Sequence, residues 1–401
     1  MSSNTDSDRL IFAEFVALLA MMMSLAALSI DAVLPALTII GGELGVEYEN
    51  TNQLIISFLF LGMSGGQIFY GPLSDAAGRK PAIYIGFIIF ISGTLLSLFA
   101  HCFTLMLAGR ALQGLGAASP RVVSIAIVRD RYEGQKMAQV MSFIMTFFII
   151  IPILAPALGQ LILSVSGWRS IFGLFLFLAF FSLIWFSLRL PETLEKEKRI
   201  PFSPVRIISS VREILNTRQS FAYTIISGLI FGSFLGYLNS SQQILQIQYG
   251  LGDKFPLYFG ILAIAFGTAT LMNSKLVTFF SMKNLILRAM QAFVILSGVF
   301  LVFSLAQNGH PPFLSFMLYL IPLFFTIGIL FGNLNALAME PLDHIAGIGA
   351  STIGSLSTFT ALAIGTVIGQ SYDGTILPLI SGFLLLGTTA LVIIQLVDRK
   401  R

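Results

Sequence analysis

Apolar residues run in long blocks along this chain, and short polar segments separate the blocks. A helix needs about 20 mostly apolar residues to cross the hydrocarbon layer of a membrane. Twelve blocks reach that length, at residues 10–39, 52–71, 81–100, 103–127, 137–163, 170–189, 220–247, 255–274, 285–306, 312–338, 346–371 and 375–396. The pattern therefore predicts an all-α integral membrane protein with twelve transmembrane helices.

The longest polar stretch between these blocks divides the chain into two halves with six predicted spans each. It reads PETLEKEKRIPFSPVRIISSVREILNTRQ and carries mixed charge and three prolines. We interpret it as a tether with a short surface helix. The pattern predicts an N-terminal six-helix bundle over residues 1–190, a cytoplasmic linker over residues 191–219 and a C-terminal six-helix bundle over residues 220–401. Two joined bundles are common among secondary transporters.

Basic residues between the spans fall almost entirely on one side of the membrane when the spans alternate in direction. That side holds Arg79, Lys80, Arg129, Arg131, Lys136, the basic residues of 189–218, Lys275, Lys283, Arg288, Arg399, Lys400 and Arg401. The other side holds Arg169 and Lys254 among several acidic residues. Cytoplasmic loops are enriched in Lys and Arg, so both termini are expected in the cytoplasm. The first nine residues lack a basic region, so the first span is not expected to be a cleaved signal peptide.

Composition narrows the classes of function. Of the 401 residues, 56% are hydrophobic and 10% are charged, whereas soluble domains carry about 25% charged residues. The single cysteine, Cys102, excludes an internal disulfide, and three scattered histidines argue against a metal site. No G-x-x-x-x-G-K-[ST] nucleotide loop occurs. We therefore expect no metal, no cofactor, no nucleic-acid partner and no enzymatic activity.

Three charged residues lie within the predicted spans away from their ends, where charges are costly and usually functional, while Glu14 near the inner end of the first span is treated as interfacial. Asp31 lies in the outer part of the first span, and Arg110 is expected at a similar depth in the fourth. Arg121 follows eleven residues later, close to three helical turns, so both arginines project from one face. Asp31 with Arg110 is either a proton-coupling pair or a static ion pair between two helices. Arg121 either joins this coupling or reaches for the inner interface.

The segment between the second and third spans is a candidate conformational latch. It reads Gly71-Pro72-Leu73-Ser74-Asp75-Ala76-Ala77-Gly78-Arg79-Lys80, and its outer glycines permit a tight turn. We expect Arg79 to pair with Asp130 or Glu133, and Asp75 to face the start of the eleventh span at residues 346–349. Such contacts would hold one conformation and break in another. The alternative is an ordinary charged turn. The candidate latch residues are Gly71, Asp75, Gly78, Arg79, Lys80 and Asp130.

This loop resembles the G-x-L-x-D-x-x-G-R-[KR] signature of the major facilitator superfamily. Other segments narrow the resemblance to its drug:proton antiporters, in particular the bicyclomycin and chloramphenicol resistance (Bcr/CflA) branch. They are Asp31–Leu37, Arg110–Ala118, Val128–Asp130, Gly167–Phe172, Pro191–Leu194, Asn335–Met339 and Ala346-Gly347. The resemblance therefore covers nearly the whole chain.

The resemblance implies the major-facilitator fold and multidrug efflux, with export from the cytoplasm driven by inward proton movement across the bacterial inner membrane. It also implies antibiotic resistance, with Asp31 and Arg110 as the proton-coupling pair. Two features depart from the family's pattern. Val33 replaces a frequent tyrosine, and the antiporter-motif helix keeps Pro152, Pro156 and Gly159 but lacks one of the usual paired glycines. The segment 21–24 lacks a second acid, which argues against doubly cationic drugs.

Polar and adaptable residues within the apolar spans are candidates for the substrate path. They are Met23, Gln67, Asn239, Gln243, Asn333 and Asn335. The alternative role for each polar one is a hydrogen bond between helices. With little charge around the presumed cavity, we expect a neutral or weakly charged amphipathic substrate.

These observations favour a proton-coupled secondary transporter that exports small amphipathic molecules by alternating access. We expect a monomer in the lipid bilayer, driven by protons. The alternative is a facilitator or importer of a small metabolite without drug export, because direction does not follow from fold. A membrane-embedded enzyme ranks below both, since no catalytic constellation is visible.

Overall fold

The computed structural model describes residues 12–398, and this part of the chain is helical without β-strands. Twelve helical segments are long and apolar enough to cross a membrane, which confirms the predicted number of spans. The α-helices are α1 (Phe12–Asp31), α2 (Leu37–Glu43), α3 (Leu54–Ala77), α4 (Arg79–Leu98), α5 (Phe103–Arg131), α6 (Gly134–Ser166), α7 (Arg169–Arg189), α8 (Pro204–Asn216), α9 (Arg218–Ser241), α10 (Phe255–Phe279), α11 (Met282–Ala306), α12 (Phe313–Met339), α13 (Ala346–Gln370) and α14 (Leu377–Asp398).

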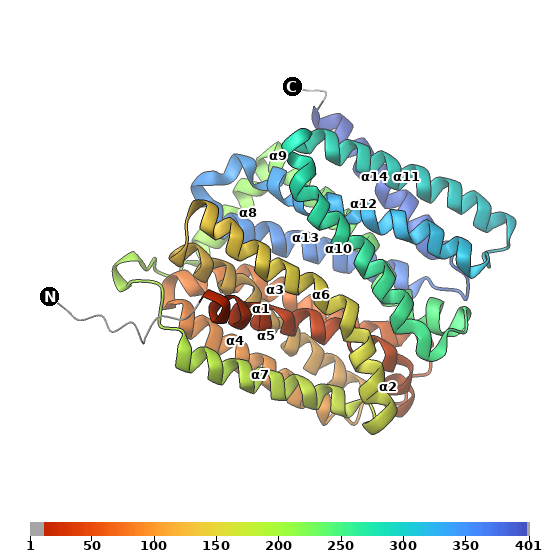
Figure 1. Ribbon diagram of the computed structural model, residues 1–401, viewed down its shortest axis with the longest axis horizontal. Coiled ribbons are helices and arrows are strands. Elements are labelled where there is room, and N and C mark those ends of the chain that lie inside the picture. Colours follow the sequence, from red (N-terminus) through yellow and green to blue (C-terminus); the bar gives the residue numbers. More distant parts are fainter. Residues whose placement is uncertain (1–11, 399–401) are drawn as a thin grey trace.

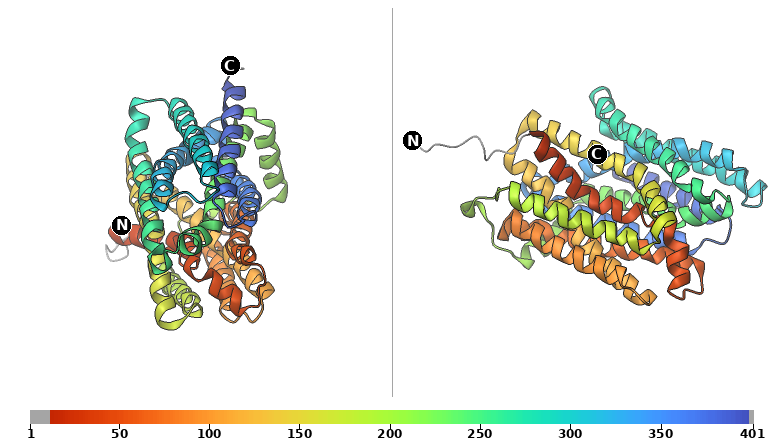
Figure 2. Two further views of the ribbon diagram at one scale, coloured as in Figure 1. Left: turned by 90° about the vertical axis from the view of Figure 1, so that its right-hand side faces the viewer. Right: turned by 60° about the horizontal axis from the view of Figure 1, so that its bottom comes forward.

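The long helices lie side by side in two groups (Figure 1), with α1 to α7 in one group and α9 to α14 in the other. The groups meet where α3 packs against α13 and α6 packs against α10. Figure 2 shows the same two groups from an end and from below. We call the end that carries α8 and the α3–α4 turn the linker end, at the left of Figure 1. The opposite end, with α2, is the far end.

The outward surface of the helices is strongly apolar. Leu188, Phe177 and Leu314 are more than 60% exposed, while many Ser, Thr, Asn and Gln side chains are buried inside. An exposed apolar surface of this extent does not occur on a soluble monomer. In a membrane, lipid hydrocarbon covers this apolar surface without the free-energy cost of exposing it to water. Hydrogen bonds in the interior satisfy buried polar groups. The chain is thus built as a multi-pass membrane protein.

The first span is not the single helix that the sequence predicted over residues 10–39. Helix α1 ends at Asp31, a 3₁₀ turn covers Leu34–Ala36, and α2 begins at Leu37. Pro35 explains the break. In a continuous helix its ring would clash with the carbonyl of residue 31, four positions earlier, and it has no N–H to donate. Asp31 is therefore the last residue of α1 and lies at a discontinuity inside the protein.

The linker contains the short surface helix that its sequence suggested. Helix α8 begins with Pro204 in its first turn, and the side chain of Ser203 accepts a hydrogen bond from the backbone N–H of Arg206 at 3.4 Å. Both features are favoured helix starts. The helix packs against the second group through buried Ile214 and through Ser210, whose hydroxyl lies 3.4 Å from that of Thr352.

Candidate functional site

An aromatic cavity of about 130 Å³ lies between the two groups of helices. Its aromatic lining residues are Phe60, Phe231, Phe234, Tyr237, Phe259, Phe266, Phe324 and Phe331. The rings form a connected set, with the centroids of Tyr237 and Phe324 4.8 Å apart and those of Phe231 and Phe331 5.5 Å apart. Such a surface suits a planar apolar group. We call this space the aromatic cavity.

Asp31 lines the aromatic cavity and is only 5% exposed. Within residues 12–398 the structure gives its carboxylate no hydrogen bond and no ion pair. Its cavity neighbours on α1 are the apolar residues Ala26, Ala27 and Ile30, and Arg121 reaches the same cavity from α5. A carboxyl group in such a place has a strong electrostatic reason to bind a proton or a cation.

Arg110 is fully buried and lies close to the end of α1, as the sequence predicted. Its guanidinium donates to the backbone carbonyl of Ser29 at 2.8 Å, to that of Ile55 at 3.0 Å, and to the side chain of Gln113. In the described chain it makes no ion pair with Asp31, so the static pair considered as the structural alternative is not formed here. Arg110 instead connects α5 to α1 and α3 by hydrogen bonds. Its acceptor on α1, the carbonyl of Ser29, lies two residues before Asp31.

Helix α6 packs closely against the segment that follows α1, at Gly159, a residue that the sequence analysis named. A Cβ atom on Gly159 would lie 2.0 Å from the carbonyl oxygen of Ala32, so only glycine permits this approach. Pro152, one helix turn before Pro156, lines the aromatic cavity. Gly159 and Pro152 therefore lie next to the segment that holds Asp31, and Pro156 lies between them along α6.

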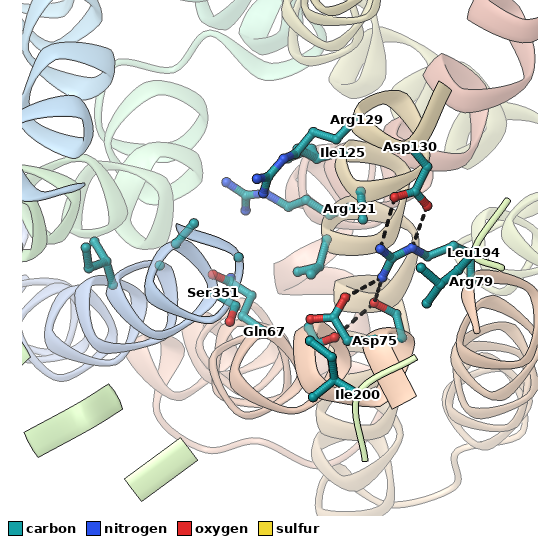
Figure 3. Close-up of a pocket in the computed structure, with 18 of the residues that line it drawn as sticks. Gln67, Asp75, Arg79, Arg121, Ile125, Arg129, Asp130, Leu194, Ile200 and Ser351 are labelled. Atoms are coloured by element: carbon teal, nitrogen blue, oxygen red, sulfur yellow. Dashed lines mark hydrogen bonds and ion pairs between the residues drawn. The ribbon is translucent and has the colours of Figure 1, made fainter. Parts of the chain in front are cut away.

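A second, wider cavity of about 640 Å³ lies at the linker end, and we call it the vestibule (Figure 3). It is bounded by α3, α5, the linker, α12 and α13. Arg121 lines both the vestibule and the aromatic cavity, so it stands where the two spaces meet. The sequence placed Arg121 near the inner interface or in the coupling group. Its position at this junction was not foreseen.

The predicted latch residues cluster at the wall of the vestibule. Arg79 donates to Asp130 at 2.8 Å and to Asp75 at 2.6 Å, and its side chain is only 8% exposed (Figure 3). Asp130 is one of the two partners, Asp130 or Glu133, that the sequence predicted for Arg79. Gly78 has a φ of +108°, which favours glycine at the turn between α3 and α4. Asp75 shares a smaller cavity with residues 346–348, the start of α13.

Glu192 belongs to this cluster, although the sequence gave it no role. Its carboxylate accepts hydrogen bonds from the backbone N–H groups of Arg79 at 2.9 Å and Lys80 at 3.0 Å, and so caps the start of α4. A carboxylate at a helix N-terminus is favoured by both hydrogen bonding and the helix dipole. The sequence feature that could have indicated this role is the position of Glu192 just after the sixth span, on the same side of the membrane as the latch loop.

Hydrogen bonds between neutral side chains join the two groups at the far end. Asn50 donates to the backbone carbonyls of Gln370 at 3.0 Å and Tyr372 at 2.8 Å, and Gln370 donates to the carbonyl of Asn50 at 2.6 Å. Gln243 donates to the side-chain oxygen of Asn50 at 2.8 Å, and Gln53 donates to Gln243. We call Asn50, Gln53, Gln243 and Gln370 the far-end amide bridge.

The six predicted substrate residues lie in four different places. Gln67 and Asn335 line the vestibule. Asn239 and Gln243 connect the two groups, since Asn239 donates to Ser57 at 3.3 Å and Gln243 belongs to the far-end amide bridge. Asn333 exchanges hydrogen bonds with Asn273 at 2.8 and 3.1 Å, and Met23 is a buried residue of α1. None of the six is among the residues that line the aromatic cavity.

Known proteins resemble the chain over most of its length. Residues 17–370 match the family described as Major Facilitator Superfamily. The chain is 28% identical over 355 residues to the uncharacterized MFS-type transporter YdgK of Bacillus subtilis, covering 88% of this chain and 87% of that protein. It is 27% identical over 370 residues to the bicyclomycin resistance protein homolog of Haemophilus influenzae, covering 91% of each. The multidrug resistance protein MdtL of Escherichia fergusonii is 30% identical over 328 residues, covering 81% and 80%.

Solved structures agree on the fold. A D-xylose–proton symporter superimposes with a TM-score of 0.71 at 15% identity, covering 96% of this chain and 97% of the other. The human transporter MFSD10 gives a TM-score of 0.66 at 17% identity, covering 97% and 99%. The relatives are consistent with the bicyclomycin-resistance branch proposed from the sequence. The chain belongs to the major facilitator superfamily of membrane transporters.

Proposed function

We propose that this transporter exports small amphipathic molecules from the cytoplasm in exchange for protons across the bacterial inner membrane. The linker end faces the cytoplasm in this proposal, because the basic segments gather there. The observation that carries it is Asp31, a carboxylate without an ion-pair partner in the described chain, at the wall of an aromatic cavity between two bundles.

The geometry supports an inward-facing resting state. The vestibule lies at the linker end, while the far-end amide bridge joins the bundles on the other side. A substrate enters through the vestibule and places its apolar part among the aromatic rings. Opening of the far end then breaks the amide bridge and gives Asp31 access to external protons. Closing of the vestibule brings the start of α13 towards Asp75, which is the role proposed for the latch.

Asp31 couples the two movements in this scheme. Protonated Asp31 is neutral. Protonation therefore lowers the free-energy cost of burying this side chain while the substrate-free transporter returns to the state with the open vestibule. The inward movement of one proton contributes about 2.3 kcal/mol per 100 mV of membrane potential. Arg110 positions the end of α1 through backbone carbonyls rather than through the carboxylate. No cofactor is required, and one chain contains both bundles, so a monomer suffices.

Purified protein in sealed liposomes tests the proposal. We expect amphipathic compounds added to wild type to release an imposed pH gradient, and Asp31→Asn to abolish this release while compound binding persists. Asp373→Asn is the control, because this carboxylate lies in the loop before α14, away from the cavities. If compounds cross equally in wild type and Asp31→Asn, and no protons move with them, the facilitator alternative replaces proton-coupled export.

A further inference from the structure

A groove of about 580 Å³ runs along the outside of the protein between α6 and α10. These helices lie side by side where the two groups meet (Figure 1). They run in opposite directions, so the end of α6 and the start of α10 share the far end. Ser164 and Ile153 mark the two ends of the α6 wall, which corresponds to about 16 Å of helix. The groove is therefore about as long as one leaflet of a hydrocarbon layer of about 30 Å.

Apolar and polar residues are separated along this groove. Leu257 and Ile264 belong to its apolar walls and are 62% and 51% exposed, so they face lipid hydrocarbon. Gln160, Ser164 and Asp253 are its polar lining residues, and they gather at the mouth of the groove at the far end. An apolar channel with a polar mouth at the leaflet surface matches a phospholipid, whose acyl chain lies in the hydrocarbon and whose headgroup lies at the interface.

The polar mouth favours a headgroup that donates hydrogen bonds. Asp253 is exposed and is the only charged residue among the described residues that line the groove. Its carboxylate accepts a hydrogen bond from the side-chain amide of Gln160 at 2.8 Å, and within residues 12–398 it makes no ion pair. The amide oxygen of Gln160 is buried without a hydrogen-bond partner in the same part of the chain. A carboxylate next to an unsatisfied amide oxygen attracts an ammonium group and repels an anionic headgroup.

The mouth also connects the two groups of helices. Gln160 belongs to α6 in the first group, whereas Asp253 precedes α10 in the second. None of the described residues of the groove lines the aromatic cavity or the vestibule, so the groove is separate from the proposed substrate path. A ligand that binds both sides of the mouth has its full affinity only while the far end is closed. It therefore shifts the equilibrium towards the closed state by its difference in affinity for the two states.

We propose that the groove binds phosphatidylethanolamine from the far-end leaflet, and that the bound lipid stabilises the far-end-closed conformation. The headgroup ammonium donates hydrogen bonds to Asp253 and Gln160, and one acyl chain lies along the apolar walls. Ala157, a small exposed side chain in the middle of the α6 wall, leaves room for this chain. The site goes beyond the proposed function, because it concerns a membrane lipid and neither the exported molecule nor the proton.

Binding of two matched lipids tests the assignment of the headgroup. Phosphatidylethanolamine and phosphatidylcholine with the same acyl chains differ only in the methyl groups on the headgroup nitrogen, and only the first has N–H donors. Native mass spectrometry of the full-length protein in a nonionic detergent measures the affinity of the first bound lipid molecule. We expect wild type to bind phosphatidylethanolamine about threefold more tightly, since an exposed charged contact contributes modestly and Lys254, the neighbour of Asp253, offsets part of it.

Two pairs of variants locate this preference. Asp253→Asn should make the two affinities equal, whereas Asp373→Asn, which changes another exposed carboxylate at the far end, should keep the threefold ratio. Ala157→Phe fills the groove and should weaken the binding of both lipids by the same factor. Ala306→Phe, at an exposed position near the far end of α11, should weaken neither. If Ala157→Phe does not fold, Asp253→Asn decides alone, and an unchanged ratio in that variant overturns the site.

Spin labels on both bundles at the far end, in a Cys102→Ser background, test the conformational part of the proposal. Nanodiscs of phosphatidylcholine are compared with nanodiscs that also contain phosphatidylethanolamine. We expect phosphatidylethanolamine to raise the ratio of closed to open populations about threefold, which is the full difference in affinity between the two lipids, and Asp253→Asn to remove this change. The same ratio in both kinds of nanodisc for wild type overturns the stabilising role.

Three other outcomes would overturn the lipid site. Equal affinity of wild type for the two lipids shows that the headgroup is not recognised. Displacement of the bound lipid by amphipathic compounds that cross the membrane through wild type assigns the groove to the substrate. Two chains in the mass spectrum, with loss of bound lipid, assign it to a second copy of the protein. All of these measurements are made without a proton gradient, so their outcome does not depend on the liposome measurement with Asp31→Asn.

Discussion

The two ends of this transporter are held by different chemistry. At the linker end, Arg79 binds two carboxylates and Glu192 caps α4, and all of these residues belong to the first bundle or to the start of the linker. At the far end, neutral amide side chains cross from one bundle to the other. The charged contacts therefore stabilise one bundle, whereas the neutral contacts hold the two bundles together.

The difference matches the energetics of each place. Charges at the linker end are partly exposed, with 36% exposure for the Asp75 side chain, so water limits the cost of keeping them charged. At the far end, Gln53 and Gln243 are buried between the bundles, where an ion pair would be costly to separate in every transport cycle. Amide hydrogen bonds each contribute about 1 kcal/mol and separate more easily. Salt should therefore weaken the linker-end contacts and leave the far end nearly unchanged.

Removal of the linker-end charge is expected to have the largest effect on stability. Arg79→Gln leaves Asp75 and Asp130 without their counter-charge, and we expect a loss of about 3 kcal/mol, reduced by the exposure of Asp75. Thermal unfolding in detergent measures the loss. Lys80→Gln is the control, because the Lys80 ammonium donates to a backbone carbonyl at an exposed site.

The comparison also predicts what Arg79→Gln leaves unchanged. Its contacts do not cross between bundles, so the distance between bundles at the far end should stay the same. Spin labels on both bundles, in a Cys102→Ser background, report this distance. A shift of the far end in Arg79→Gln, with little change in stability, would mean that the contacts of Arg79 hold the two bundles together rather than stabilise the first bundle.

A break in the far-end amide bridge is expected to change conformation more than stability. Gln243→Leu removes a side chain that accepts from Gln53 and donates to Asn50 between the bundles. We expect the free energy of the far-end-open state to fall by about 2 kcal/mol relative to the resting state. In the closed bundles Asn50 and Gln53 lose their partner and stay buried from water, whereas in the open state water can bind them. The spin-label distance across the far end should lengthen.

Gln246→Leu is the matched control for that change. Gln246 lies three residues further along the same segment and accepts a hydrogen bond from Gln242 within it, so this hydrogen bond does not cross the bundles. Its spin-label distances should match those of wild type. Equal shifts in the two variants would mean that the local π-helix over Gln242–Gln248, and not the bridge between bundles, controls the opening.

The sequence predicted the twelve spans because bilayer thickness fixes how long an apolar block must be. It also narrowed the partner of Arg79 to Asp130 or Glu133, since opposite charges in adjacent loops on one side of the membrane have few other partners, and the structure shows the pair with Asp130. The partners of Arg110 were not predictable in the same way. They are mainly backbone carbonyls, which every residue carries, so no pattern of side chains marks them.

The residues that line the aromatic cavity could not be predicted from the sequence either, for a different physical reason. The chain has 37 phenylalanines, and lipid, helix neighbours and a cavity for apolar substrates favour the same side chain. Phe177, for example, is 64% exposed on the outer surface, while Phe231 lines the cavity. Hydrophobicity alone does not indicate whether a phenylalanine faces lipid or the cavity. The packing of helices that are distant in the sequence determines this.

The smallest expected effect concerns a single hydroxyl at the far end. Thr38 accepts a hydrogen bond from Gln242 at 2.9 Å across the two bundles. Thr38→Val keeps the shape and removes this bond, while Gln242 keeps its bond to Gln246, so we expect a shift of about 1 kcal/mol towards the far-end-open state. Thr388→Val, whose hydroxyl bonds within its own helix, serves as control. Since the five hydrogen bonds of the far-end amide bridge remain, the spin-label distribution should broaden towards longer distances without losing the resting peak. A complete switch to the open state would mean that the bridge acts as one cooperative unit rather than as a sum of separate bonds.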